Sequence, residues 1–300
     1  MFRILLLNML LILSCFSIQA QTKQVKEVTK VIEKSFQYST GDELNISGEK
    51  ADVQVESWDK NQIQITLTVS AMHPQEAQAK KDVESITLRS SKNSNKVYIS
   101  NILDKSDVDK KPSSKLNSSF VIKIPSDCPV YLKTEFGYVK VKDLSNKVKL
   151  NSQFTDIGLE NIQGVVDVQS KFGELDGKSI DGDMFLDTRR TEITLRDLKG
   201  NFDIKAHYGT LNIFADPNVA NLKISADNTK IHLITSDPGK FAYQIDAKES
   251  ELDMPEQLMM KFQDLSPNTS LKKLKFEPRK EFYANIQISI AFSEMTISSR

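Results

Sequence analysis

FGYVKV, at residues 136–141, is the first copy of a phrase that recurs at a constant interval, as FTDIGL (154–159), FGELDG (172–177), RTEITL (190–195) and YGTLNI (208–213). Two looser copies follow, NTKIHL (228–233) and ESELDM (249–254). A fixed period of about 20 residues indicates one small structural unit that is stacked many times. The period therefore predicts an architecture, but it does not predict an activity.

Within each unit, apolar and polar residues alternate, which is the pattern of a β-strand with one buried face. If the first residue of the phrase is position 1, positions 4 and 6 are apolar in nearly every copy, and positions 13 and 15 form a second apolar pair, such as Val166 and Val168. Glycine occupies position 11 in three successive turns, at Gly164, Gly182 and Gly200. We therefore expect an all-β fold, a β-solenoid whose rungs of about 18 residues stack at strand spacing, about 4.8 Å.

Position 1 carries a run of aromatic residues. Four of the first five copies have one there, at Phe136, Phe154, Phe172 and Tyr208. Arg190 interrupts the run. Because equivalent positions of stacked units lie above one another, these rings are expected to form a ladder, and we interpret it as part of the core rather than as a ligand site.

The segments that flank the repeats also alternate. Residues 21–118 are predicted to form an N-terminal β-rich part of the domain, with one short helix at 74–85. Residues 119–254 hold the solenoid repeats. Residues 255–300 are predicted to be a C-terminal cap, whose alternating stretch at 282–297 would cover the last open rung.

Residues 1–20 resemble an export signal, with a short positive start, an apolar run and a small residue before the predicted cleavage between Ala20 and Gln21. The mature chain is therefore expected in the periplasm, at the cell surface or secreted. A lipid anchor on Cys15 is the alternative, and it is less favoured because the apolar run continues beyond the cysteine. In the cleaved soluble form Cys128 is the only cysteine, so a disulfide-built fold is not expected.

The charge balance limits the classes of partner. Lysine plus arginine equals aspartate plus glutamate, at 40 each, which gives no general electrostatic reason to bind nucleic acid or an anionic membrane. No segment after the leader is apolar enough to predict a transmembrane helix. We therefore expect no nucleic-acid partner and no membrane span in the mature chain.

The sequence contains no recognisable catalytic or cofactor motif. His73, His207 and His232 are scattered and form no zinc-binding spacing. Cys128 has no histidine near it in the sequence, and there is no nucleophile elbow. No catalytic residue, metal site or cofactor is therefore predicted.

Carboxylates are the remaining candidates for binding or catalysis. Asp156, Glu174 and Glu192 occupy position 3 of consecutive rungs, where they would stack at about 4.8 Å. Asp181 and Asp183 form a second acidic group. Either set would be able to hold calcium or to act on a sugar, but a solvated acidic stripe is the preferred interpretation.

Three stretches together resemble a bacterial family of putative adhesins, exported β-strand-repeat domains of unknown function. They are GDELNISGEKADVQVESWDK (41–60), FVIKIPSDCPVYLKTEFGYVKVKDL (120–144) and the repeated rungs that follow, and the resemblance covers about residues 36–254. It implies an exported β-helical domain, and it brings no catalytic residues with it.

The leading hypothesis is a non-enzymatic exported β-solenoid that acts as an adhesin or a cell-envelope interaction module, with a surface glycan or an envelope protein as partner. The first alternative is a polysaccharide lyase or hydrolase built on a β-helix, which rests on fold analogy. The second is a periplasmic scaffold that binds a protein partner. The sequence does not decide the ligand, the handedness of the stack or the oligomeric state.

Overall fold

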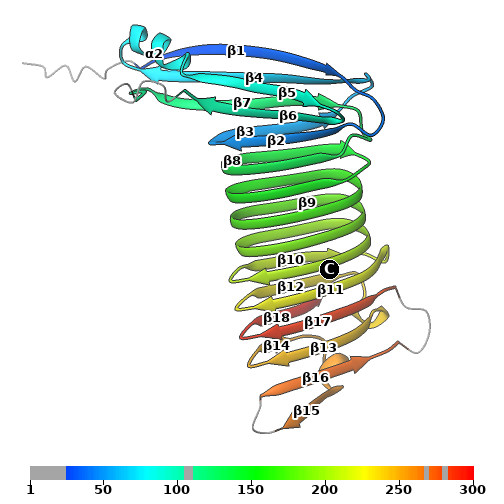
Figure 1. Cartoon of the computed structure of the whole chain (residues 1–300). Coiled ribbons are helices and arrows are strands. Elements are labelled where there is room, and N and C mark those ends of the chain that lie inside the picture. Colours follow the sequence, from blue (N-terminus) through cyan, green and yellow to red (C-terminus); the bar gives the residue numbers. More distant parts are fainter. Residues whose placement is uncertain (1–24, 105–110, 267–269, 279–282) are drawn as a thin grey trace, which may run out of the picture.

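A computed structural model describes residues 25–104, 111–266, 270–278 and 283–300. The predicted signal sequence, with Ala20 and Gln21 at its cleavage site, lies outside the described residues, as does Cys15. The expected all-β class is confirmed, since strands make up most of the described chain (Figure 1). The strands form one long stack that runs from the N-terminal to the C-terminal part of the molecule.

The N-terminal end of the stack is largely antiparallel. Its elements are β1 (Lys26–Gln37), β2 (Glu43–Glu49), β3 (Ala51–Ser57), β4 (Gln62–His73), α2 (Glu76–Val83), β5 (Ile86–Asn93), β6 (Lys96–Leu103) and β7 (Lys115–Ile124). On one side β4 lies between β1 and β7, antiparallel to both, and β7 continues in parallel to β3. On the other side β5 and β6 form an antiparallel pair, and β6 continues in parallel to β2. The helix expected at 74–85 is confirmed as α2, which packs on β1 and β4.

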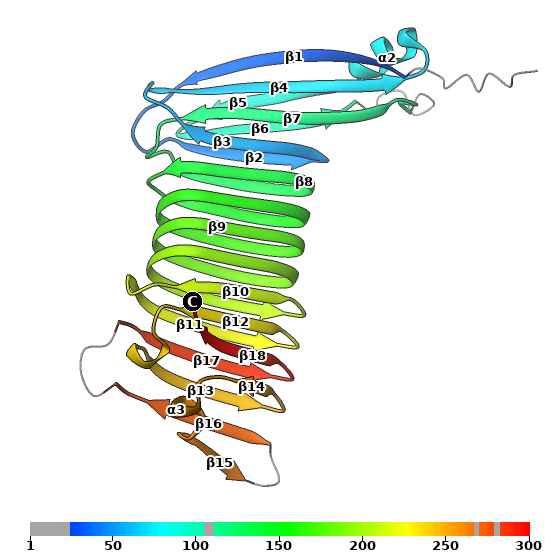
Figure 2. The same ribbon diagram turned by 180° about the vertical axis from the view of Figure 1, so that it is seen from behind.

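The repeats form the middle of the stack, in β8 (Val130–Leu144) and β9 (Val148–His207). Their parallel register follows the period: Val130 lies opposite Val148, and Glu192 lies opposite Thr210, each pair being one repeat apart. Figures 1 and 2 show the chain winding back and forth through this region. One repeat unit makes one such winding, which we call a turn of the stack, and successive turns lie side by side.

Left-handed residues make the corners of each turn. At position 1 the φ angles lie between 50° and 60°, at Phe136, Phe154, Phe172, Arg190 and Tyr208. At position 8 they lie between 51° and 59°, at Asp143, Asn161, Ser179 and Asp197. A left-handed residue in an extended chain reverses its direction, because it rotates the following peptide out of the plane of the strand. Two such residues per unit thus divide it into two strand segments.

The predicted inward positions form the core between these segments. Position 4 is buried at Val139, Ile157 and Leu175, and positions 13 and 15 are buried at Val166 and Val168. Burial of each such side chain stabilises the fold by about 1.5–3 kcal/mol. The alternation in the sequence therefore identified the buried face correctly.

The aromatic ladder is not part of this core, so that prediction is wrong. The exposed fraction of the side chain is 43% for Phe136, 46% for Phe154 and 44% for Tyr208. Position 1 is a corner, and a corner side chain points outward, whereas hydrophobicity alone suggested burial. The stacking itself is present, with ring centroids 5.1 Å apart for Phe136 and Phe154 and 4.6 Å apart for Phe154 and Phe172.

The C-terminal part departs from the predicted order. Its elements are β10 (Thr210–Ala215), β11 (Val219–Asp227), β12 (Lys230–Thr235), η1 (Pro238–Lys240), β13 (Ala242–Lys248), β14 (Glu251–Asp253), α3 (Glu256–Met259), β15 (Phe262–Ser266), β16 (Leu271–Phe276), β17 (Asn285–Ala291) and β18 (Glu294–Ser299). The last two strands, β17 and β18, lie between the turn formed by β11 and β12 and the turn formed by β13 and β14 (Figure 2). Ile288 of β17, for example, lies opposite both Ile224 and Ile245.

The prediction that 282–297 covers the last rung is therefore wrong, because β17 and β18 are themselves an inserted turn. The antiparallel strands β16 and β15 lie beyond β13 instead. FSEMTI, at 292–297, is a further copy of the phrase: Phe292 has a φ of 50°, and Met295 and Ile297 are buried. The copy is out of order along the chain, and for that reason the period did not reveal it.

A second unrecognised copy lies at the other end of the repeats. KADVQV, at 50–55, begins with Lys50 at a φ of 51°, and Val53 lies opposite Val139 in parallel register. Residues 56–135 separate it in sequence from the next copy in the stack. The repeat therefore extends into the N-terminal part, where β2 and β3 form a turn of the stack.

Candidate functional site

The three position-3 carboxylates lie along one side of the stack, beside the aromatic ladder. Asp156, Glu174 and Glu192 are exposed and line a shallow depression of about 360 Å³ together with Arg190 and Tyr208. The structure thus brings the three predicted residues together, and it adds a cation and a phenol to them.

One of these carboxylates has a structural contact. Oδ1 of Asp156 accepts a hydrogen bond of 3.0 Å from the backbone N–H of Glu174 on the next turn. Asp52 makes the equivalent contact, at 2.9 Å, with the backbone N–H of Tyr138. In both cases the residue before the donor is a glycine with positive φ, Gly137 or Gly173. Asp156 therefore helps to hold two turns together, whatever else it binds.

Both residues of the second acidic group, Asp181 and Asp183, bind side chains of the neighbouring turn. Asp181 pairs with Lys199 at 2.7 Å, and Asp183 accepts a hydrogen bond of 2.8 Å from the amide of Asn201. Asn201 in turn accepts one of 2.8 Å from Asn221. Among the residues that the structure describes, no group of three or more His, Cys, Asp or Glu side chains is arranged to hold a metal ion.

The aromatic ladder presents ring edges rather than ring faces to solvent. Phe136, Phe154 and Phe172 stack almost parallel, with interplanar angles of 6° and 3°. The guanidinium of Arg190 lies 5.6 Å from the ring centre of Phe172 and 5.9 Å from that of Tyr208. Because neighbours cover both faces of Phe154 and Phe172, the middle of the ladder offers a sugar ring little of the face contact on which aromatic stacking depends.

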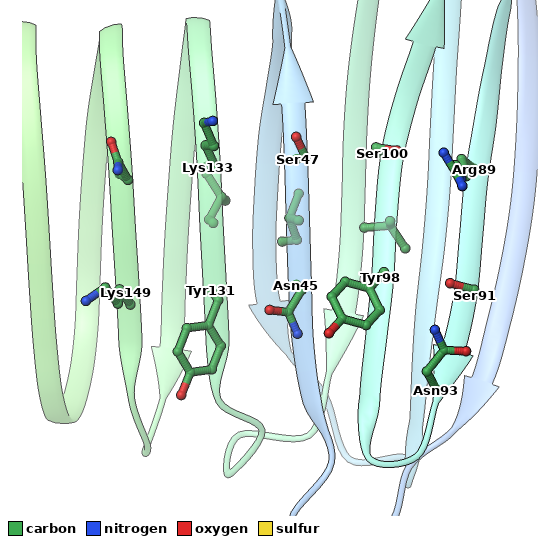
Figure 3. A pocket seen from close by; sticks show the side chains of 14 residues that line it. Asn45, Ser47, Arg89, Ser91, Asn93, Tyr98, Ser100, Tyr131, Lys133 and Lys149 are labelled. Atoms are coloured by element: carbon green, nitrogen blue, oxygen red, sulfur yellow. The ribbon is translucent and has the colours of Figure 1, made fainter.

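A larger cavity, of about 630 Å³, lies on the outward face near the N-terminal end of the stack. Five strands contribute to it: β5, β6, β2, β8 and the start of β9 (Figure 3). Since side chains of a strand alternate between its two faces, Ile46, Ile99 and Leu132 point to the core below, and the polar residues between them point outward.

The outward side chains form two rows across these strands. The first row runs Ser91, Tyr98, Asn45, Tyr131, Lys149, each opposite the next in register. The second row runs Arg89, Ser100, Ser47, Lys133, Asn151 in the same way. Figure 3 shows Asn45 between the rings of Tyr131 and Tyr98, with both ring faces turned towards the viewer. We call this set of ten residues the tyrosine surface.

The electrostatics of the tyrosine surface favour a ligand with acceptor groups. Its lining residues include the cations Arg89, Lys133 and Lys149 and no carboxylate. Lys149 is paired with Asp167 at 2.8 Å, and this hydrogen-bonded partner raises the pKa of the lysine. Within the described part of the chain, neither Arg89 nor Lys133 takes part in an ion pair.

This arrangement suits the recognition of a polar ring compound. The two tyrosines supply faces for stacking and hydroxyl groups for hydrogen bonds, and Asn45 and Asn151 supply amides that both donate and accept. Binding sites commonly combine a few such polar groups with aromatic surface.

The tyrosine surface was not predicted from the sequence. Its residues come from segments as far apart as Asn45, Tyr98 and Tyr131, and they meet only because β2 stacks between β6 and β8. The available signal was the aromatic and amide character of outward positions in alternating strands. That signal carries no information about which strands are neighbours.

Comparison with known proteins places the chain among β-rich domains. The family model described as Toastrack DUF4097 matches residues 41–282. No curated protein matches the sequence. In the part of the chain that the structure describes, no helix has the length and apolar character needed to span a membrane.

Solved structures similar to this chain share little of its sequence. A putative adhesin from Bacteroides fragilis NCTC 9343 is 12% identical, with 90% of this chain and 97% of that one covered, at a TM-score of 0.43. A putative lipid binding protein from Parabacteroides distasonis ATCC 8503 is 11% identical, with 90% and 97% covered, at a TM-score of 0.35. A putative cell adhesion protein from Clostridium sporogenes ATCC 15579 is 11% identical, with 92% and 100% covered, at a TM-score of 0.25.

The match to the family model spans well over half of the chain, from the turn before β2 to the segment before β17. It includes the repeats of β8 and β9 and, in their entirety, all five strands that form the tyrosine surface. The chain therefore belongs to the Toastrack DUF4097 family.

Proposed function

We propose that this protein is an exported, non-enzymatic binding module of the cell envelope or surface, an adhesin-like β-solenoid with rungs of about 18 residues, whose ligand is a saccharide. The observation that carries the proposal is the row of Tyr98, Asn45 and Tyr131 in a cavity of about 630 Å³. Open aromatic faces that flank an amide are suited to stacking on sugar rings and to bonding their hydroxyl groups.

Export is part of the same proposal. It is supported by the leader-like residues 1–20, with cleavage between Ala20 and Gln21, and an anchor on Cys15 is the alternative form. In either form the tyrosine surface belongs to the exported part of the chain, where it would meet envelope or surface glycans.

The absence of catalysis is also proposed. A glycosidase requires a pair of carboxyl groups across the bond it cleaves, and the lining of the tyrosine surface contains none. The carboxylates of the position-3 depression are exposed, and Asp156 is bound to the backbone of the next turn.

A second candidate function has one specific observation in its favour. Glu174, Glu192, Arg190 and Tyr208 line the same depression, and such a set of acid, cation and phenol would suit a polysaccharide hydrolase or lyase. It predicts that Glu174→Gln and Glu192→Gln abolish turnover, whereas Asp176→Asn, on the neighbouring outward position, leaves turnover unchanged.

The experiment that tests both candidates applies the 21–300 protein to immobilised polysaccharides and measures retention together with new reducing or unsaturated ends. Retention without cleavage, lost in the Tyr98→Ala/Tyr131→Ala double variant, supports the binding module. Phe185→Ala is the matched control, because Phe185 is an exposed aromatic on an outward position of a later turn (49% exposed). Cleavage would favour the enzyme. Absence of both, together with capture of an envelope protein, would favour the periplasmic scaffold.

A further inference from the structure

The tyrosine surface carries a concentration of positive charge that the chain as a whole does not. Lysine plus arginine and aspartate plus glutamate are balanced at 40 each in the full sequence. The lining of this cavity contains three cations and no carboxylate, and Lys149 alone of the three has an ion-pair partner in the described part of the chain. A cation that the protein leaves unpaired beside a binding surface is available to a ligand anion.

The two unpaired cations lie in one row. Ser100 and Ser47 lie between Arg89 and Lys133 on the two intervening strands. The backbones of the two cations are therefore three strand spacings, about 14 Å, apart. The row that contains Tyr98 and Tyr131 runs beside that of the cations, and the backbones of these two tyrosines lie two strand spacings, about 10 Å, apart. Figure 3 shows the two rows next to each other, with Arg89 and Lys133 at opposite sides of the cavity.

We propose that the saccharide recognised here is acidic, with carboxylate or sulfate groups that pair with Arg89 and Lys133 while its rings lie on Tyr98 and Tyr131. This inference rests on the proposed function and names its ligand class. Because the backbones of the two cations lie three strand spacings apart, we expect a ligand that pairs with both to span at least two sugar units. Ser47 and Ser100 lie between the cations and donate hydrogen bonds to the same groups.

Nucleic acid also combines rings with negative charge, but it fits this surface less well. Affinity for a nucleic acid comes largely from the neutralisation of many phosphates by lysine and arginine side chains. Two unpaired cations on a chain of balanced charge supply few such contacts. An acidic saccharide carries more hydroxyl groups per ring than a nucleic acid does, which matches two cations surrounded by amides and hydroxyls.

The test compares acidic polymers with neutral polymers of the same backbone. The 21–300 protein is applied to immobilised polygalacturonate and its carboxyl-reduced form, to dextran sulfate and dextran, and to an oligothymidylate, at low and at physiological salt. The variant is Arg89→Gln/Lys133→Gln. The matched control is Lys171→Gln/Lys178→Gln, which removes the same charge from two exposed lysines elsewhere on the stack.

The inference predicts retention on the acidic member of at least one pair, and at least tenfold weaker binding in the Arg89→Gln/Lys133→Gln variant, because the variant loses the charge-assisted hydrogen bonds to the ligand. The Lys171→Gln/Lys178→Gln control should bind as the unchanged protein does. Polygalacturonate and dextran sulfate distinguish carboxylate from sulfate as the anionic group.

Other outcomes overturn the inference. Equal retention on acidic and neutral polymers would show that the ligand is not recognised by its negative charge, and so would equal loss of binding in the variant and the control. In either case the proposed function stands if Tyr98→Ala/Tyr131→Ala still abolishes binding. Tighter binding to oligothymidylate makes the partner a nucleic acid. No retention on any polymer overturns the inference and the saccharide function together.

Discussion

Single residues at the corners of the stack decide whether neighbouring turns can approach each other. Gly182 has a φ of 145°, and a Cβ atom built on it would lie 2.0 Å from the carbonyl oxygen of Gly164 on the preceding turn. A Cβ atom built on Gly200 would likewise lie 2.2 Å from the carbonyl oxygen of Gly182. Glycine is therefore required at residues 182 and 200 for two reasons, the backbone conformation and the close contact between turns.

We predict that Gly182→Ala destabilises the protein by more than about 2 kcal/mol, because it adds both a strained φ and a backbone clash. Gly158→Ala is the control: its φ is not left-handed, and the one close neighbour of the new Cβ would be the hydroxyl oxygen of Tyr138, at 2.9 Å. That hydroxyl ends a flexible side chain, so we expect a loss below about 1 kcal/mol. Midpoints of urea unfolding for the two variants check this, and equal midpoints would contradict it.

Cys128 is predicted to be unreactive in the folded protein. Its side chain is fully buried, and burial raises the pKa of the thiol to about 12, with the charges of Asp127 and Asp42 adding to the shift. At pH 8 a thiol reagent should therefore label the protein only after urea unfolds it. Rapid labelling of the native protein would contradict the burial.

The same shift has a consequence for stability. Because the pKa is raised in the folded state, the stabilising contribution of the neutral thiol is complete below the pKa of the unfolded thiol, about 8.5. It is lost progressively as the pH rises from there towards about 12. Cys128→Ala should therefore lose less stability than the unchanged protein between pH 8 and pH 10, as measured by urea unfolding.

At the scale of the element, each turn of the stack is held by inward apolar side chains, and the aromatic ladder adds stacking outside them. Phe154 is 46% exposed and lies between Phe136 and Phe172. We predict that Phe154→Ala lowers the free energy of unfolding by about 1–2 kcal/mol, because it removes two stacking contacts.

Ile157, only 2% exposed on the same turn, provides the comparison. Ile157→Ala should cost about 2–5 kcal/mol, because it leaves a cavity in the core. Thermal unfolding of both variants measures the difference. If Phe154→Ala were as damaging as Ile157→Ala, the assignment of the ladder to the outer surface would be wrong.

Alternation predicted the inward face of each turn, because a period of two follows directly from strand geometry. It did not predict the corners at position 1, since phenylalanine is rare in the left-handed region and nothing in its side chain indicates that conformation. The acidic candidates were identified by their shared position 3 in the repeat, and Asp156, Glu174 and Glu192 do line one depression. The tyrosine surface was missed because its rows are created by pairing between distant segments, such as Asn45 with Tyr131.

At the scale of the whole molecule, the order of turns in space differs from their order in the chain. The strands β17 and β18, which end at Ser299, separate β11 and β12 from β13 and β14. The turn at 242–253 therefore has no neighbour towards the repeats until β17 and β18 are in place. Completion of this end must therefore wait for these late strands.

The last prediction tests this order with one substitution in β17. Ile288 is 3% exposed and packs between two turns, opposite Ile224 and Ile245, so Ile288→Asp would bury an unpaired charge there. We expect β17 and β18 to leave the stack and β13, β14 and β16 to lose their attachment, while the repeats remain folded. Hydrogen exchange should show lost protection over residues 242–253 and 271–276 and retained protection over residues 148–207.

Gln287→Asp is the matched control, since Gln287 is the exposed neighbour on the same strand. It should leave both regions protected, because an outward carboxylate remains solvated. If the C-terminal strands merely covered the end of a sequentially ordered stack, Ile288→Asp would expose residues 283–300 alone and residues 242–253 would stay protected. Loss of both segments together therefore requires the inserted order, because only then does the turn at 242–253 depend on β17 for its contact with the rest of the molecule.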